Sequence, residues 1–201
     1  MYSHHPKEHT MSWTAQHRRG DVLRELAERL EQREDHTLAP VLPTTVPAPF
    51  HDHRDLVGAL QFRWHHRLVG LLEQRLDADP ESSADRAGAV SEAWAEAARS
   101  LPGLRALLDA QLVDPVDPEV GEAMRRATAK ERQLLAAMAG IGGRVDVRPD
   151  SRAVSAGREL EQAARARLAE RPEPSVAPSR VERVPRGSAR FVRRLREVLA
   201  A

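Results

Sequence analysis

Cysteine is absent from this chain of 201 residues, which excludes disulfide bonds, thiolate catalysis and cysteine-ligated zinc. Aromatic residues make up only 3% of the sequence, and the β-branched and aromatic residues typical of sheets are scarce. No run of about 18 apolar residues is present, so we expect no transmembrane helix. The first residues are polar and histidine-rich, without the apolar centre of a secretory signal, so we expect a cytoplasmic location.

The residues that dominate instead are alanine, leucine, arginine and glutamate, which favour helices. The length suffices for one core of ordinary size. We therefore predict an all-α fold: a bundle of four to five main helices, followed by a proline-rich tether and a short amphipathic helix at the C-terminus.

The most strongly patterned stretch is residues 50–76, which we expect to form the central helix of the bundle. Leucine or tryptophan recurs there every three or four residues, which aligns these side chains on one helix face. A second apolar set, Gly58, Phe62 and Val69, lies on the opposite side. Apolar groups on two sides predict a helix buried between neighbours. Asp52 or His51 is the expected cap, with Asp55 in the first turn.

Changes in composition divide the chain into five segments. We expect residues 1–11 to be disordered and residues 12–140 to form the bundle. Residues 141–171 predict an additional helix, which packs on the bundle or extends from it. Residues 172–187 are a proline-rich linker, and residues 188–201 have the pattern of a basic amphipathic helix.

Within the bundle, residues 37–50 contain four prolines, so this segment cannot form a helix or a central strand. We expect it to lie extended over the bundle, with Val41, Leu42 and Val46 packed against it. The first helix is predicted from Trp13 to about Asp35, with Gly20 as a candidate kink and a solvated end from Glu31 onwards.

Proline and its neighbours also mark the remaining helix ends. Ser100 is the expected cap of a helix that carries Pro102 in its first turn. Asp117 and Pro118 predict the start of the next main helix, and Gly140 predicts its C-terminal cap. A further helix is expected from Ser151 to about Glu170.

Four phrases carry a resemblance: SWTAQHRRGDVLREL, DLVGALQFRWHHRLVGLLEQ, LPGLRALLD and AMRRATAKERQLLAAMAG. Together they are similar to a group of small all-helical proteins of unassigned function from high-GC bacteria. The resemblance covers about residues 12–140 and contains no catalytic motif. It implies that the segment after Gly140 is an appendage, and it implies no activity, cofactor or partner.

Histidine is the first candidate for chemistry, because residues 50–76 contain four of the nine histidines. His53 and His65 would lie about 18 Å apart along a helix, which is too far to share an ion. His65 and His66 point about 100° apart around the helix axis. A site at His51 and His53 would need ligands from elsewhere, such as the His4, His5 and His9 segment. We predict no metal and no cofactor, and no Glu-x-x-His pair of a di-iron bundle is present.

Glu131 is the second candidate, because it interrupts an apolar stripe between Ala127 and Leu134. A buried carboxylate needs a partner or must be neutral. The expected partners lie on the central helix, and the alternatives are a buried ion pair, a contact at the bundle rim and a polar ligand site. The candidate polar set comprises Arg63, His65, His66, Arg67 and Glu131.

The third candidate is the C-terminal segment, where residues 180–201 contain seven arginines and two glutamates. A basic amphipathic helix on a tether binds nucleic acid, an anionic membrane or an acidic protein groove. The alternative is that its apolar stripe packs back on the bundle. The candidate partner-binding residues are Arg190, Phe191, Arg193, Arg194, Leu195 and Arg196.

No hydrolase, phosphate-loop or dinucleotide motif is present, so we predict a non-catalytic protein. The expected function is protein interaction or regulation, with an unidentified protein partner. The alternatives are a small-ligand or metal-binding helical protein that uses the polar residues of the central helix, and a nucleic-acid-binding protein that uses the C-terminal segment. The sequence does not indicate an oligomeric state.

Overall fold

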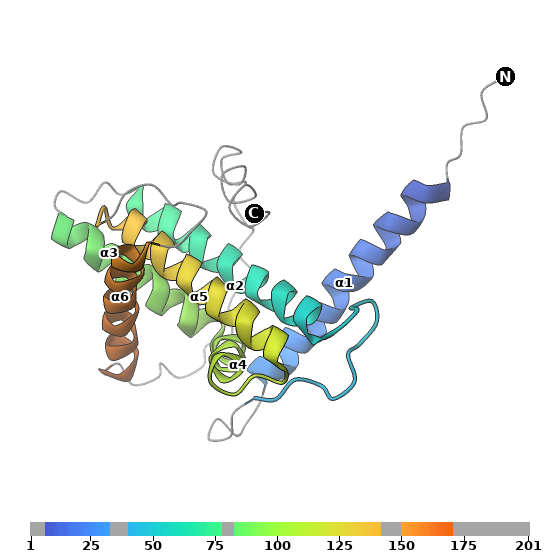
Figure 1. The fold of residues 1–201 in the computed structure, drawn as a ribbon. Helices are drawn as coiled ribbons and strands as arrows, with labels where there is room; N and C mark the ends of the chain where they lie inside the picture. Colours follow the sequence, from blue (N-terminus) through green and yellow to red (C-terminus); the bar gives the residue numbers. More distant parts are fainter. Residues whose placement is uncertain (1–6, 33–39, 78–82, 142–149, 171–201) are drawn as a thin grey trace. The chain divides into compact units, whose positions relative to one another are not determined.

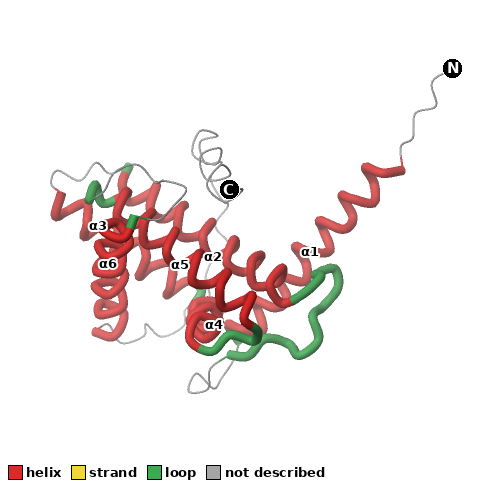
Figure 2. Tube along the Cα trace, in the orientation of Figure 1, coloured by secondary structure: helices red, strands yellow, loops and turns green. Residues whose placement is uncertain are grey.

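The computed structural model describes residues 7–32, 40–77, 83–141 and 150–170. Six helices and no strand are found in these residues, which confirms the all-α prediction (Figure 1, Figure 2). None of these helices is both long and apolar enough to cross a membrane. The helices are α1 (Lys7–Glu31), α2 (His53–Leu76), α3 (Ser83–Ser100), α4 (Pro102–Val113), α5 (Pro118–Met138) and α6 (Ser151–Glu170).

The described residues form two compact units, of which the first comprises those within residues 1–65 and 100–127. It contains α1, α4 and the first parts of α2 and α5. Helices α1 and α4 pack against each other, and their backbones meet where Gly103 faces the carbonyl of Leu30. A Cβ at Gly103 would lie 2.2 Å from that oxygen, so only glycine fits there. The buried apolar residues of this unit include Ala27, Leu30, Leu42, Phe50, Leu56, Val57, Leu60, Trp64, Leu104, Leu107, Leu108, Val120 and Met124.

The second unit comprises residues 66–99 and 128–201, and its described part contains α3, α6 and the remaining parts of α2 and α5. Helix α6 crosses α5 closely at Gly157 (Figure 1). A Cβ at Gly157 would lie 1.9 Å from the carbonyl oxygen of Arg132, so the crossing requires glycine. The buried apolar residues of this unit include Leu68, Leu71, Leu72, Val90, Ala93, Trp94, Ala97, Leu135, Ala136, Ala139, Ala153, Leu160 and Ala164.

Several helix ends match their sequence signals. The Asp117 carboxylate accepts a hydrogen bond from the Val120 N–H at 2.8 Å, and Pro118 is the first residue of α5. At the other end Gly140 has a φ of 74°, in the left-handed region that favours glycine. Helix α6 runs from Ser151 to Glu170, as predicted.

Helix α1 starts earlier than predicted and shows no break at Gly20. It begins at Lys7, so residues 7–11 are helical although we expected them to be disordered. Lysine and glutamate there are good helix formers, and Pro6 precedes a helix without interrupting it. The helix continues through Gly20, because a single glycine weakens a helix without having to bend it.

The prediction that α2 has two buried faces is wrong. Its leucine and tryptophan stripe is buried, but Gly58 is exposed, Phe62 is 58% exposed and Val69 is half-buried. The helix therefore has one buried face. Apolar spacing reports which side chains share a face, but not whether a neighbouring element covers that face.

The segment before α2 was also predicted only in part. Residues 40–50 contain no regular secondary structure, as four prolines require, and Leu42 is buried. Val46 is half-buried, whereas Val41 is 78% exposed, contrary to its expected packing. Neighbouring side chains of an extended segment point in opposite directions, so Val41 and Leu42 cannot both face the same core.

The start of α4 is capped differently from its prediction. Ser100 is the last residue of α3, and the N-cap position of α4 is Leu101, whose side chain makes no capping hydrogen bond. The Glu31 carboxylate of α1 accepts the N–H groups of Gly103 at 2.9 Å and Leu104 at 3.1 Å. The expectation of a solvated Glu31 is therefore wrong, because a charge from another helix replaces the local cap.

Candidate functional site

The predicted polar set is distributed between buried and exposed positions. His65 and Glu131 are buried, Arg63 is half-buried, and His66 and Arg67 are exposed. Arg63 and His65 belong to the first unit, and the other three belong to the second. The predicted ion pair between Glu131 and the central helix stays a prediction.

Glu131 is 4% exposed, and its carboxylate accepts a hydrogen bond from the indole N–H of Trp94 at 2.8 Å. Sequence reasoning missed this contact. The available signal was Trp94 itself, which lies on the buried stripe of α3 and whose N–H requires an acceptor when it is buried.

Trp94 also belongs to a wider polar network in the second unit. The guanidinium of Arg165 lies 4.8 Å from the centre of a Trp94 ring. Arg165 donates to Glu161 at 2.9 Å, and Glu161 accepts a second bond from Arg132 at 2.8 Å. Hydrogen bonds and a cation–π contact thus connect α3, α5 and α6. This network orders the helices of the unit around Trp94.

In the first unit, the start of α2 is organised around Asp55. The Asp55 N–H donates to the Asp52 carboxylate at 2.7 Å, and the Asp55 carboxylate accepts the N–H of His51 at 3.2 Å. Asp52 is thus the cap, one of the two residues expected, and the Asp55 carboxylate binds the backbone of His51, the residue before the cap.

Arg19 of α1 holds Asp55 from the other side. Its guanidinium donates two hydrogen bonds to the carboxylate, at 2.9 and 2.7 Å. These bonds hold the pKa of the Asp55 carboxyl well below its usual range and raise the pKa of Arg19. The same guanidinium lies 4.4 Å from the centre of the Phe50 ring. Arg19 is therefore fixed in orientation by a carboxylate and an aromatic ring.

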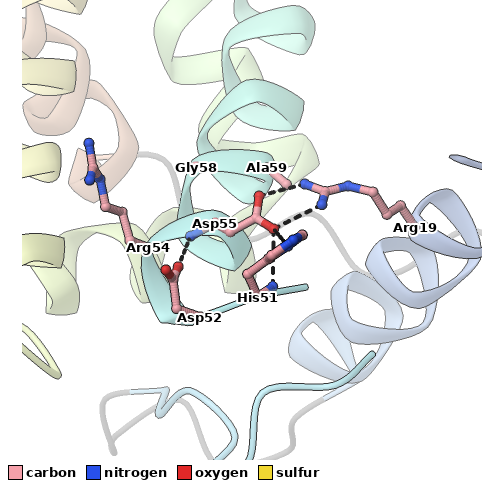
Figure 3. A pocket seen from close by; sticks show the side chains of 7 residues that line it. All are labelled: Arg19, His51, Asp52, Arg54, Asp55, Gly58 and Ala59. Atoms are coloured by element: carbon pink, nitrogen blue, oxygen red, sulfur yellow. Dashed lines mark hydrogen bonds and ion pairs between the residues drawn. The ribbon is translucent and has the colours of Figure 1, made fainter. Parts of the chain in front are cut away.

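An open hollow surrounds this arrangement on the surface of the first unit (Figure 3). Gly58 and Ala59 lie on α2 between Arg19, which reaches over from α1, and Arg54, which extends in the opposite direction. We refer to it as the α1–α2 hollow. Its lining residues are Arg19, His51, Asp52, Arg54, Asp55, Gly58 and Ala59.

Phe62 follows Gly58 by one helical turn on the same side of α2. Residues four apart in a helix are separated by about 6 Å along the axis and about 40° around it. Both residues are exposed. An open hollow and an exposed aromatic side chain therefore lie about one turn apart on one helix face.

The described residues contain no group of three histidine, aspartate or glutamate side chains placed to hold a metal ion. His51 lies beside Asp55, with 3.3 Å between Nδ1 and a carboxylate oxygen, and His53 Nε2 lies 3.0 Å from the carbonyl oxygen of Pro43. The candidate residues of the C-terminal segment, such as Phe191 and Arg194, lie outside the described residues.

No protein-family model, curated protein or solved structure matches this chain. The resemblance to small helical proteins from high-GC bacteria therefore stays a prediction.

Proposed function

We propose that the chain is a non-catalytic interaction protein, and that its partner protein docks on the exposed face at the start of α2. The observation that carries the proposal is the position of Phe62, 58% exposed and one turn from the α1–α2 hollow. Exposure of a large aromatic ring to water costs free energy that burial against a partner would recover. Aromatic side chains are enriched in protein interfaces and among the residues that dominate binding energy.

Gly58 also supports the proposal, because it carries no side chain. A Cβ at this position would meet no other group within 4 Å, so the fold has room for a larger residue. Glycine in a helix interior costs about 1 kcal/mol relative to alanine. Its absent side chain leaves the α2 backbone open to close approach, which is what an incoming side chain requires.

The rim of the hollow suits an aromatic side chain. Guanidinium groups contact aromatic rings in this protein, as Arg19, Arg105 and Arg165 show. Arg19 is already oriented by Asp55, so little conformational entropy would be lost when a partner binds. A partner ring placed over Gly58 would lie beside Arg19, which already contacts the Phe50 ring.

Site-specific photo-crosslinking in the cells that naturally produce the protein tests the proposal. A photoreactive phenylalanine analogue replaces Phe62 in one variant and Val113, which is 85% exposed in the same unit, in a control. We expect a protein adduct from position 62, abolished by Gly58→Leu and retained with Gly20→Leu. Gly20 is a matched control, because it too is an exposed helical glycine with nothing within 4 Å of its Cβ position.

Two results would overturn the proposal. One is the absence of any adduct from position 62. The other is an adduct that forms equally from position 113 or survives Gly58→Leu, because either result would place the contact elsewhere.

The two other candidate functions stay predictions. They are ligand or metal binding by the polar residues of α2, and nucleic-acid binding by the C-terminal segment. Neither gains support from a contact in the described residues comparable to the arrangement at Gly58 and Phe62.

A further inference from the structure

Gly58 and Phe62 are a small and a large residue that lie one turn apart on the same face of α2. If two copies of α2 lie antiparallel, with a twofold axis level with residue 60, residue 58 of each copy stands opposite residue 62 of the other. The Phe62 ring of each copy then lies over the hollow beside Gly58 of its partner. The face is thus complementary to itself, as a twofold interface requires.

We propose that the partner protein is a second copy of this chain, bound through this antiparallel pairing of α2. The inference rests on the proposed function, since it names the partner for the same surface. In such a dimer two equivalent Phe62 rings become buried, and each lies near Arg19 and Arg54 of the other copy. Absence of a side chain at Gly58 lets the helices approach closely at the point where the rings insert.

The charges of the α1–α2 hollow are compatible with a second copy and disfavour two strongly charged occupants. Its lining contains two arginines and two aspartates, so its formal charge is zero apart from His51. Two identical neutral surfaces meet without net repulsion, whereas a nucleic acid would find no excess of positive charge. The C-terminal segment, with seven arginines and two glutamates in residues 180–201, would find no excess of negative charge.

The expected interface is small. A single helix pair buries less than the roughly 1,200 Å² at the lower limit of stable standard interfaces. We therefore expect a weak dimer, with a dissociation constant in the micromolar range or above, in equilibrium with monomer.

Sedimentation velocity of the purified full chain tests this inference over a range from about 1 µM to about 1 mM, which covers the dissociation constants expected for a weak dimer. We expect the weight-average sedimentation coefficient to rise from the monomer towards the dimer value for the unmodified chain and for Gly20→Leu. It should stay at the monomer value for Gly58→Leu and for Phe62→Ser. Circular dichroism confirms that each variant is folded.

Gly58→Ala provides a second variant in case Gly58→Leu fails to fold. It adds one methyl group to the hollow. The dimer affinity should fall, whereas the stability of the folded chain should rise. A chain that remains monomeric at every concentration would overturn the inference, as would a dimer unaffected by Gly58→Leu, Gly58→Ala and Phe62→Ser.

Failure of the dimer and failure of the proposed function give different results. If the purified chain is monomeric but position 62 crosslinks in cells to a different protein, and Gly58→Leu abolishes that adduct, the second copy is excluded and the docking surface stands. If neither association nor adduct is found, both proposals fail.

Discussion

Two buried charged side chains, Glu131 and Arg105, contact tryptophan rings, and so does the half-buried Arg165. Glu131 accepts the indole N–H of Trp94, Arg165 lies over a ring of the same tryptophan, and Arg105 lies over Trp64. The chain has only seven aromatic residues, and the buried Trp64 and Trp94 each contact an arginine. At the scale of single residues, these contacts explain how charged groups are accommodated in small cores.

Replacement of Glu131 tests the hydrogen bond to Trp94. Glu131→Leu leaves the buried indole N–H without this acceptor, so we expect a loss of about 1–3 kcal/mol in the free energy of unfolding. Glu131→Gln keeps an oxygen that can accept the same N–H and should cost less. Urea denaturation of both variants measures the difference. An equal loss for the two would contradict the role of Trp94 and would favour the predicted ion pair with the central helix.

The pair between Arg19 and Asp55 predicts a dependence of stability on pH. The pKa of Asp55 is lower in the folded chain than its unfolded value of about 4. The pair therefore stabilises the fold above about pH 4, and this contribution is lost as pH falls below that value. Asp55→Asn should cost about 1 kcal/mol at neutral pH, a value reduced because both side chains are about one-third exposed.

Urea denaturation measures the free energy of unfolding of Asp55→Asn and of the unmodified chain at about pH 7 and about pH 3, on either side of the unfolded pKa. The difference between the two chains should be smaller at the acidic pH. Asp21→Asn serves as the control, because Asp21 pairs with Arg24 at a well-exposed position and should change stability by less than about 0.5 kcal/mol. A difference for Asp55→Asn that does not vary with pH would contradict the assigned role of the pair.

Residue patterns predicted part of the candidate site. The burial of Glu131 followed from its place on an apolar stripe, and Asp52 and Asp55 followed from helix-start signals. The contacts of Trp94 and Arg19 did not, because they join residues 37 and 36 positions apart in sequence. Such contacts depend on which helices pack together.

At the scale of helices, the sequence predicted a helix end correctly where the group that stabilises it lies within a few residues of that end. Asp117 caps α5 through the N–H of Val120, and Gly140 ends it with a positive φ. Local signals failed at α4, whose N-terminal N–H groups bind Glu31, 72 and 73 residues earlier in the chain. A cap from a distant helix carries no signature in the adjacent sequence.

Replacement of Glu31, the cap of α4, should lower the free energy of unfolding, whereas replacement of a neighbouring glutamate should not. Glu31→Ala removes the acceptor of two N–H groups at the positive end of α4 and should cost about 1–2 kcal/mol. Glu28→Ala changes an exposed glutamate of the same helix and should have little effect. Chemical denaturation compares the two variants, and equal losses would show that Glu31 does not act as a cap.

The close contact between α1 and α4 makes a second prediction for helices. Gly103→Ala brings a Cβ to within 2.2 Å of the Leu30 carbonyl oxygen, and we expect it to lower the free energy of unfolding by about 2 kcal/mol. Gly20→Ala meets no group within 4 Å and should raise stability by up to about 1 kcal/mol. Thermal unfolding should therefore shift in opposite directions for the two variants. A tolerated Gly103→Ala would contradict the close helix contact.

At the scale of the whole molecule, the all-α class followed from composition, because alanine, leucine, arginine and glutamate leave little material for a sheet. The division into two units did not follow from it, since α2 and α5 each continue from one unit into the other without a break in their helical pattern. Sequence also could not show that one side of α2 remains exposed. That exposed face carries the proposed docking surface.

Cysteine crosslinking tests the antiparallel pairing of this face most directly, because the chain contains no cysteine of its own. A Gly58→Cys chain and a Phe62→Cys chain are mixed and oxidised, and mass spectrometry identifies the covalent dimers. The mixed pair keeps one Phe62 ring opposite an unmodified Gly58 and places the two cysteines opposite each other, so the pairing predicts that dimers with one chain of each kind exceed those formed by either chain alone. They should also exceed those formed when Gly20→Cys replaces Gly58→Cys. Absence of a covalent dimer, or a yield equal to that of the Gly20→Cys mixture, would contradict the pairing.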